Sequence, residues 1–429
     1  MMFITDGSDL IGVTRVLEIK YMVIIRSAFR VVGAWPSKFI GDVQTTSDVV
    51  VKYIQLVLNV VCQVAGILYL RENMDKLSFF ELGHSYITVL MSLVSMSRII
   101  THCTEAYQEI FSLYVRKIHL FNVRNDSEYA MEMHTKIHKL CYFLTFFIHA
   151  FMTLGILMFN LIPMYSNYIN GKFNRETGAF SGVSNATMEH AVYYLWPFND
   201  TTHPIGYAII VAFNWYISLV CSINFCTFDL FLYHLVFHIW GHLKILIHNL
   251  ETFPRPIGAI RNEEQNDYTE EESKQIYERL KKLVQHHNLI IDFIARISDT
   301  FGLSLFVYLC YHQVCGCILL LECSTLELSA LIRYGPLTAI IFQLLIQVSL
   351  VFELLGSMTE SLMNAVYDLP WEYMEVRHRR TVHIMLRQSQ VSLNTRALNM
   401  VDIGSRTMIA IIKTSLSYFV MLRTFATDD

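Results

Sequence analysis

Charged residues are scarce in this sequence, and their scarcity excludes several classes of protein. Asp, Glu, Lys and Arg make up 16% of its 429 residues, whereas soluble domains usually carry about a quarter. The formal net charge is only -4, and no basic run is long enough to follow a phosphate backbone. We therefore expect no nucleic-acid partner.

The signatures of enzymes and of metal proteins are also missing. The sequence has no P-loop, no Gly-rich dinucleotide fingerprint, no His-Glu-x-x-His and no nucleophile elbow. Its nine cysteines lie mostly in apolar runs, and their spacing fits neither a zinc site nor a disulfide framework. We predict that the protein is not an enzyme and that it needs no cofactor or metal.

A cleavable signal peptide is not expected either. Residues 1–42 mix acids and bases, and no early apolar core is followed by a small-residue cleavage site. The first membrane-spanning segment would then serve as its own insertion signal.

Long apolar runs are what the sequence does have. Hydrophobic residues make up 53% of it, and they gather in stretches of about 20 residues, the length that crosses a hydrocarbon core ~30 Å thick. Seven such stretches are residues 48–70, 78–100, 141–165, 204–228, 302–321, 334–352 and 407–425. The sequence thus predicts an all-α polytopic membrane protein with seven transmembrane helices. The last stretch is the least hydrophobic, and a helix packed on a soluble face is the alternative for it.

Lys and Arg fall mainly on one side of these stretches. The N-terminal segment and the loops after the second, fourth and sixth stretches, with their flanks, hold 25 of the 33 Lys and Arg residues. Because these residues favour the cytoplasm, we predict a cytoplasmic N-terminus and an extracellular C-terminus. Sequons at Asn185 and Asn199 then lie outside and are expected to carry glycans, whereas the sequon at Asn125 lies inside.

Several polar groups near the inner ends of the stretches have two interpretations. His234, His238 and His242 are four residues apart and have the spacing of metal ligands, but we favour packing contacts where a helix leaves the membrane. Glu353 and Glu360 either attract cations to a cytoplasmic vestibule or cap a solvated helix end, and we favour capping. Apolar residues recur at helical spacing over residues 274–298, so we expect helices to extend beyond the membrane.

The last stretch carries a polar stripe. Thr414, Ser417, Met421 and Thr424 recur at three or four residues and share one helical face. Such a stripe either lines a water-filled path or holds helices together. Met421 and Phe425 lie one turn apart near its outer end, where they would form a hydrophobic constriction that gates by dewetting.

The final third of the chain resembles the insect odorant receptors. The resemblance rests on Glu360-Ser-Leu-Met-Asn-Ala-Val-Tyr-Asp-Leu-Pro-Trp371, on Arg379-Arg380 with Leu386-Arg-Gln-Ser-Gln390, and on Ile411-Ile-Lys-Thr-Ser-Leu-Ser-Tyr-Phe-Val-Met-Leu-Arg423. His287 fits the family as well, and the closing segment does not resemble that of the family's co-receptor. The chain therefore looks like an odorant-tuned subunit over about residues 274–425.

The resemblance implies an odorant-gated, non-selective cation channel. In the family, an odorant-binding subunit assembles with a common co-receptor subunit into a tetramer in the plasma membrane of olfactory neuron dendrites. Small volatile hydrophobic ligands bind in the outer half. The outer halves of spans two, three, four and six are also rich in aromatic residues and methionine, which favours an apolar cavity there. The predicted ligand-binding residues are Phe80, His84, Met152, Gly155, Phe159, Tyr207, Ile210, Phe213 and Phe342. Among them, Met152, Gly155 and Phe159 have a spacing that resembles the third-span wall of the family's pocket. The implied pore and gate residues are Thr414, Ser417, Met421, Thr424 and Phe425.

The expected organisation alternates between cytoplasmic and transmembrane segments. In order, we predict a cytoplasmic N-terminal segment (1–46), transmembrane helices one to four with an outer ligand pocket (47–240), a cytoplasmic extension and linker (241–301), transmembrane helices five and six (302–353), cytoplasmic anchor helices (354–406), and a pore-lining seventh helix with an external tail (407–429).

Three other functions remain open at this stage. A gustatory receptor channel is one, because Ser417-Tyr418 and Thr424-Phe425 resemble a degenerate form of the closing motif of those receptors. A G-protein-coupled receptor would have the opposite orientation, and the chain lacks the Asp-Arg-Tyr and Asn-Pro-x-x-Tyr of that class. A transporter is disfavoured because the seven spans are unpaired and we expect none of their helices to be broken at Gly or Pro.

Overall fold

The computed structural model describes most of the chain. The described residues are 4–42, 46–77, 79–174, 177–181, 186–257, 267–323 and 328–427, and the side chains of 46–48, 79–81, 328–333 and 422–427 are not included. The main helices are α1 (Lys20–Val31), α2 (Ser37–Ile40), α3 (Thr46–Asn73), α4 (Phe79–Cys103), α5 (Glu105–Leu113), α6 (Glu128–Ile169), α7 (Pro204–Ser222), α8 (Phe228–Glu251), α10 (Glu270–Cys323), α11 (Leu328–Gly356), α12 (Met358–Tyr367), α13 (Val376–Ser389) and α14 (Ser405–Thr427).

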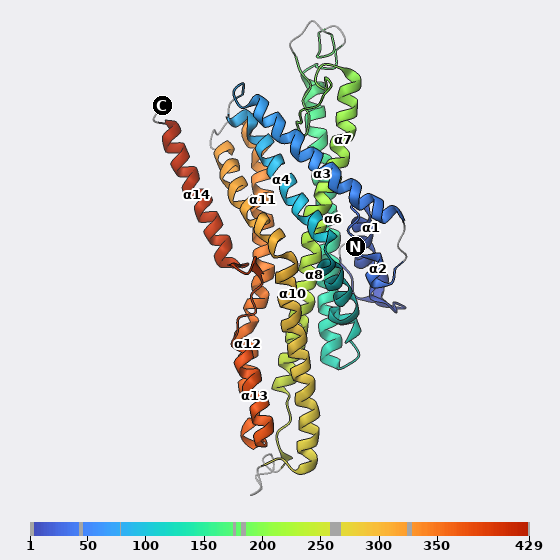
Figure 1. The fold of residues 1–429 in the computed structure, drawn as a ribbon, viewed down its shortest axis with the longest axis vertical. Helices are drawn as coiled ribbons and strands as arrows, with labels where there is room; N and C mark the ends of the chain where they lie inside the picture. The colour runs from blue at the N-terminus through green and yellow to red at the C-terminus, as the bar shows by residue number, and fades with distance from the viewer. Residues whose placement is uncertain are drawn as a thin grey trace.

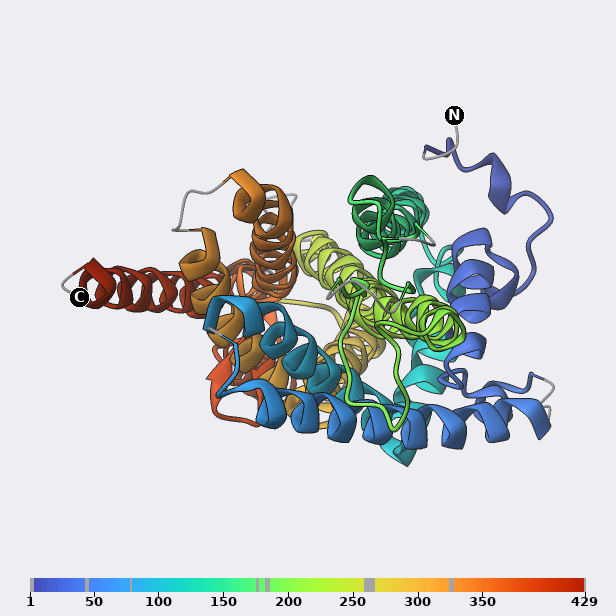
Figure 2. The same cartoon turned by 90° about the horizontal axis from the view of Figure 1, so that it is seen from above.

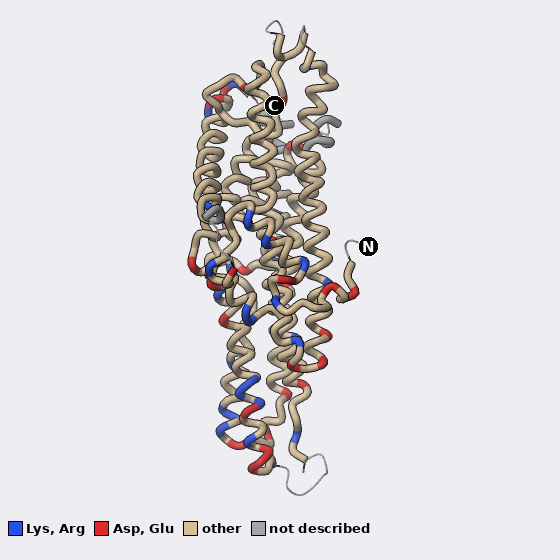
Figure 3. The backbone as a smooth tube through the Cα atoms, turned by 90° about the vertical axis from the view of Figure 1, so that its right-hand side faces the viewer, with Lys and Arg blue, Asp and Glu red and all other residues tan. Residues whose placement is uncertain are grey.

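The molecule is an elongated bundle of long helices, with a two-stranded hairpin between α13 and α14 (Figure 1). We call the end that carries residues 186–203 the outer end, and the end at which α10 begins the inner end. Seen along the bundle, α14 stands at one edge (Figure 2). Charged residues gather towards the inner end, whereas the shaft towards the outer end carries few (Figure 3).

Six helices in the described part of the chain are long and apolar enough to cross a membrane. They lie at Val49–Asn73, Leu82–Cys103, Glu128–Ile169, Pro204–Glu251, Glu270–Cys323 and Tyr334–Tyr373. The helix α14 corresponds to the seventh predicted stretch, which Lys413 makes less apolar. The prediction of an all-α polytopic membrane protein is confirmed.

Several helices run well beyond their apolar stretches. The fifth predicted span is the outer part of α10, a single helix of 54 residues whose inner part packs against α8. Its inner part buries Ile276, Leu280 and Leu283 at three- and four-residue spacing, as the sequence predicts. The helices thus form one continuous scaffold from end to end.

The fourth span is interrupted by a π-helical segment at Ile223–Thr227, between α7 and α8. A π-bulge releases backbone carbonyls from the helical ladder. Arg98 of α4 occupies this position: its Nη1 donates to Asn224 O at 2.6 Å and to Phe225 O at 2.8 Å, and its Nη2 donates to Asp229 Oδ1 at 2.6 Å. Arg98 and Asp229 are only 1% and 2% exposed.

The Arg98 guanidinium is also surrounded by rings. Its Cζ lies 4.7–4.8 Å from the ring centroids of Phe225, Phe228 and Tyr308. A buried charge is tolerated when it is paired and its donors are used. Arg98 is therefore buried among α4, α8 and α10, and it contacts groups on both neighbouring helices.

The three histidines with metal-ligand spacing bind three different groups. His234 Nε2 contacts Thr145 Oγ1 at 3.1 Å, His238 Nδ1 accepts from Leu120 N at 3.1 Å, and His242 Nε2 donates to Ile118 O at 2.8 Å. Within the described residues no His, Cys, Asp and Glu form a group that could hold a metal ion. The contacts with Thr145, Leu120 and Ile118 are packing contacts of the kind that the sequence favours for these side chains.

Candidate functional site

A loop from the outer end folds down between the helices. Leu195 N donates to Ala65 O of α3 at 3.1 Å, and His84 Nε2 of α4 bonds Ala191 O at 2.8 Å. From α7, Asn214 Nδ2 donates to Val192 O at 3.4 Å. This stretch of loop, residues 189–198, therefore ties three helices together, and we call it the outer plug.

Aromatic rings converge beneath and around the outer plug. His84 stacks on Phe159 of α6, with ring centroids 5.9 Å apart. Phe213 of α7 meets Trp196 edge-on at 5.3 Å and Tyr194 at 6.0 Å. The structure thus brings together His84 with Phe159, and places Phe213 against the plug.

Two plug residues were missed by the sequence analysis. Tyr194 and Trp196 lie in a loop that has no helical periodicity, so no face could be assigned to them. The signal available was the aromatic run Tyr193-Tyr194-Leu195-Trp196 between two apolar stretches. Tyr194 also approaches α3, because a β-carbon on Gly66 would lie 3.9 Å from its ring.

Tyr207 belongs to a second, smaller cluster nearer the outer end. It packs with Ala179 and Met188, and its hydroxyl accepts from Asn167 Nδ2 at 3.2 Å. Its ring lies 5.2 Å from that of His190. Burial lowers the pKa of His190 below its ordinary value, while Asp200 opposes this shift. Tyr207 therefore supports the folded loop and not the rings of His84 and Phe159.

The remaining predicted ligand residues are distributed over three helices. Met152 is half-buried against the main core, whereas Gly155 is exposed and open space surrounds the position of a β-carbon. Ile210 of α7 is buried. Phe342 lies towards the last helix: a β-carbon on Gly316 would lie 3.4 Å from Phe342 Cζ and 3.0 Å from Ser415 Oγ. Phe80 lies outside the residues whose side chains are described.

The last helix is held on one face and open on the other. Ser415 is fully buried, and Gln313 Nε2 of α10 donates to its Oγ at 3.2 Å. Thr414 and Ser417 are exposed, and their hydroxyls donate to Ala410 O and Lys413 O of their own helix. Met421 is 44% exposed on the same side. Thr424 and Phe425 lie outside the described side chains.

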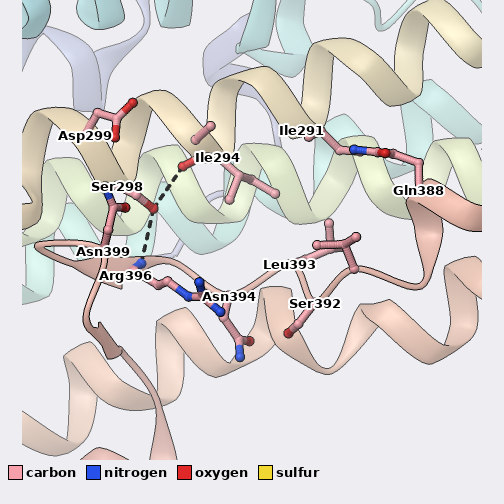
Figure 4. A pocket seen from close by; sticks show the side chains of 12 residues that line it. Ile291, Ile294, Ser298, Asp299, Gln388, Ser392, Leu393, Asn394, Arg396 and Asn399 are labelled. Carbon is pink, nitrogen blue, oxygen red and sulfur yellow. Dashed lines mark hydrogen bonds between the residues drawn. The ribbon is translucent and has the colours of Figure 1, made fainter.

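The first turn of α14 is fixed by the hairpin before it. Arg396–Ala397 (β1) pairs with Val401–Asp402 (β2), and Leu398 and Asn399 in the turn have positive φ of 51° and 57°. The hairpin rests on α10, where Ser298 Oγ accepts from Arg396 N at 3.1 Å. A cavity of about 240 Å³ lies between α10 and this connection (Figure 4).

One of the two predicted glycosylation sites can be placed. Asn199 is exposed, and its Oδ1 accepts from Thr201 N at 3.2 Å and from Thr202 N at 3.0 Å. This turn holds the sequon at the molecular surface. Asn185 lies outside the described residues.

Comparisons with known proteins agree on one family. The family model described as 7tm Odorant receptor matches residues 78–416. Odorant receptor 22c of Drosophila melanogaster is 23% identical over 225 residues, which cover 52% of this chain and 54% of that receptor. The chain thus aligns with about half the length of this relative.

Two solved structures have a similar fold. The insect olfactory receptor OR5 from Machilis hrabei matches with a TM-score of 0.72 and 14% identity, over 94% of this chain and 97% of that chain. The same receptor in complex with eugenol matches with a TM-score of 0.75 and 15% identity, over 95% and 98% of the two chains. At this identity the likeness concerns the arrangement of the helices.

Proposed function

The chain belongs to the 7tm odorant receptor family, and we propose that it is the odorant-binding subunit of a ligand-gated, non-selective cation channel. It would assemble with a co-receptor subunit in the plasma membrane of olfactory sensory neurons. The odorant would be a small, volatile, hydrophobic molecule that binds beneath the outer plug.

The single observation that best supports a channel is the divided surface of α14. Ser415 fixes one face to Gln313, while Thr414, Ser417 and Met421 lie exposed on the other. A polar face that is exposed on a membrane helix is costly unless it meets water or another polar surface. Neighbouring subunits arranged around such faces would enclose a water-filled path.

A route from ligand to pore is supported by contacts of α11. Phe342 of α11 and Ser415 of α14 both lie next to Gly316 of α10. At the inner end of α11, Glu353 binds the first residue of α14. An odorant changes the open fraction only if it binds the open arrangement more tightly than the closed one. An odorant that contacts both the outer plug and α11 would provide such a difference.

The proposal is tested by recording currents from cells that express this chain with a co-receptor. We expect odorant-evoked cation currents that require both subunits. Cysteines at Thr414 and Ser417 should then react with a thiol reagent and block the current, whereas a cysteine at the buried Ser415 should not. No current across a broad odorant panel, with both subunits at the cell surface, would contradict the proposal.

A further inference from the structure

A small cavity lies within the bundle, away from the outer plug. It has a volume of about 40 Å³ and lies between α6, α8 and α11, with α8 packed against both neighbours. Four polar side chains reach it: Asp229 and Tyr233 from α8, and Gln343 and Gln347 from α11. Polar groups are rare at this depth of a membrane protein and call for a physical explanation.

Two of these groups have unused hydrogen-bonding capacity. Asp229 Oδ1 is bound by Arg98, but Asp229 Oδ2 has no hydrogen-bond partner among the described residues. The Tyr233 hydroxyl is likewise without a partner there, and both residues are 2% exposed. The Tyr308 hydroxyl is a hydrogen-bonding neighbour of the same carboxylate, but it forms no hydrogen bond of good geometry within the described chain. An unpaired polar atom costs free energy, and the hydrocarbon of the bilayer has no groups that could form the missing hydrogen bond.

The polar groups of the cavity distinguish between possible ligands. A cation would add charge to the Arg98–Asp229 pair, which is already neutral as a unit, in a medium of low dielectric constant. A carbonyl or ether oxygen cannot donate a hydrogen bond to Asp229. A hydroxyl group donates to Asp229 Oδ2 and accepts from Tyr233, so it satisfies both.

The surroundings of the cavity fit the rest of such a molecule. A water needs roughly 10–15 Å³ of such space, so a cavity of about 40 Å³ accommodates a hydroxyl and the carbon that bears it. Phe147 and Phe151 of α6 line the cavity and are 39% and 37% exposed at the surface of the bundle. Their rings are nearly parallel, with centroids 6.3 Å apart. An apolar chain would lie along these rings towards the bilayer.

We propose that this cavity binds the hydroxyl group of a slender, membrane-soluble alcohol. The site is separate from the outer plug, and it requires neither a co-receptor nor an open channel. It is lined by the carboxylate of Asp229, the phenol of Tyr233 and the amides of Gln343 and Gln347.

Photolabelling of the full-length protein in lipid nanodiscs tests the proposal. The probe is an octanol that carries a diazirine and an alkyne, and the matched control probe is its methyl ether, which cannot donate a hydrogen bond. We expect the alcohol to label peptides that contain Phe147–Phe151 and Ile340–Gln347 at least about tenfold more than the ether does. Excess 1-octanol should remove this labelling, and excess octyl methyl ether should not.

Two variants assign the labelling to the cavity. Tyr233→Phe removes the hydroxyl that donates to the bound oxygen and Gln347→Leu removes one amide, and each should reduce labelling by the alcohol about tenfold. Tyr107→Phe is the control, because its hydroxyl is also buried and without a partner in the described chain, but it lies in α5 away from the cavity. Equal labelling by both probes would show that the cavity holds water only and would overturn the proposal. Unchanged labelling by the alcohol in Tyr233→Phe and Gln347→Leu would overturn it as well.

Labelling does not depend on any current. The labelling result can therefore be interpreted even if no current is found. Conversely, a failure of labelling would not contradict the channel proposal.

Discussion

Glu353 of α11 binds Ser405, the first residue of α14, through two hydrogen bonds. Glu353 Oε2 accepts from Ser405 N at 2.9 Å and from Ser405 Oγ at 3.0 Å. Gly404 permits the approach, since a β-carbon there would lie 2.5 Å from the same oxygen. A carboxylate at a helix N-terminus satisfies free N–H groups and complements the helix dipole. Glu353 is thus a cap, as the sequence favoured, but of another helix than its own.

Replacing Glu353 should loosen the start of the last helix. Glu353→Gln keeps the shape but weakens the charge-assisted bonds, and we expect it to cost about 1 kcal/mol of stability. The midpoint of thermal unfolding should fall, and odorant-evoked current should decrease at equal surface expression. Glu360→Gln is the matched control, because Glu360 is exposed on the next helix. Equal effects of the two substitutions would rule out a specific role for the cap.

Breaking the Arg98–Asp229 pair should be far more damaging. Arg98→Met leaves a buried carboxylate without its counter-charge, which typically costs about 3–5 kcal/mol. We expect little monodisperse protein in size-exclusion chromatography and little at the cell surface. The double variant Arg98→Met with Asp229→Leu removes both charges and should recover part of the loss. A double variant as poor as the single one would mean that the two charges are not coupled.

Substituting Phe159 should alter which odorants activate the protein. Phe159→Leu removes the ring stacked on His84 beneath the outer plug, and a ring-to-aliphatic change in an apolar site typically alters affinities by about 10-fold or more. Phe143→Leu is the control on the same helix, because Phe143 is 41% exposed on the surface of the bundle. Response profiles over one odorant panel provide the measurement. If both variants keep the wild-type profile, Phe159 does not contact ligand.

A larger residue at Gly316 should displace α14 from α10. A β-carbon there would lie 3.0 Å from Ser415 Oγ, so Gly316→Val overfills the contact, at a cost of about 1–3 kcal/mol. Odorant-evoked current should be lost or become constitutive, while Gly335→Val, at a position with open space around it, should behave as wild type. Whole-cell recording with and without odorant distinguishes these outcomes. A wild-type response from Gly316→Val would show that the α10–α14 contact does not affect the balance between the closed and open channel.

Glycosylation tests both the sequon and the orientation. Treatment with an N-glycosidase should increase the gel mobility of the wild-type protein, and this shift should diminish in Asn199→Gln because the exposed sequon is lost. Asn125→Gln should leave the shift intact, since that sequon is predicted to face the cytoplasm. Loss of the mobility shift in Asn125→Gln would show that Asn125 faces the outside, which contradicts the predicted orientation.

The sequence was most informative where buried residues recur at a regular helical spacing. The apolar stretches predict the long helices, and the recurrence of Ile276, Leu280 and Leu283 predicts the inner part of α10, because a helix repeats its buried face every three to four residues. The polar stripe of α14 is recoverable in the same way, and Thr414 and Ser417 do share its exposed side.

The contacts between helices were not predictable from the sequence by itself. Nothing in the loop that holds Tyr194 and Trp196 indicates that it turns inwards, because its fold depends on hydrogen bonds to Ala65 O of α3 and to the His84 side chain of α4. The pairing of Arg98 with Asp229 joins residues 131 apart in the chain. Such pairs have no local pattern, so they appear only once the helices are placed.

The uninterrupted course of α10 has a mechanical consequence. A helix of 54 residues is about 80 Å long, and it is packed against α4, α8, α11, the hairpin and α14 along the way. A helix of this kind transmits tilt as a lever does: a rotation of about 5° moves a point 40 Å from the pivot by about 3.5 Å. A change of a few degrees in the tilt of α10 about its middle therefore displaces its inner end by several ångströms.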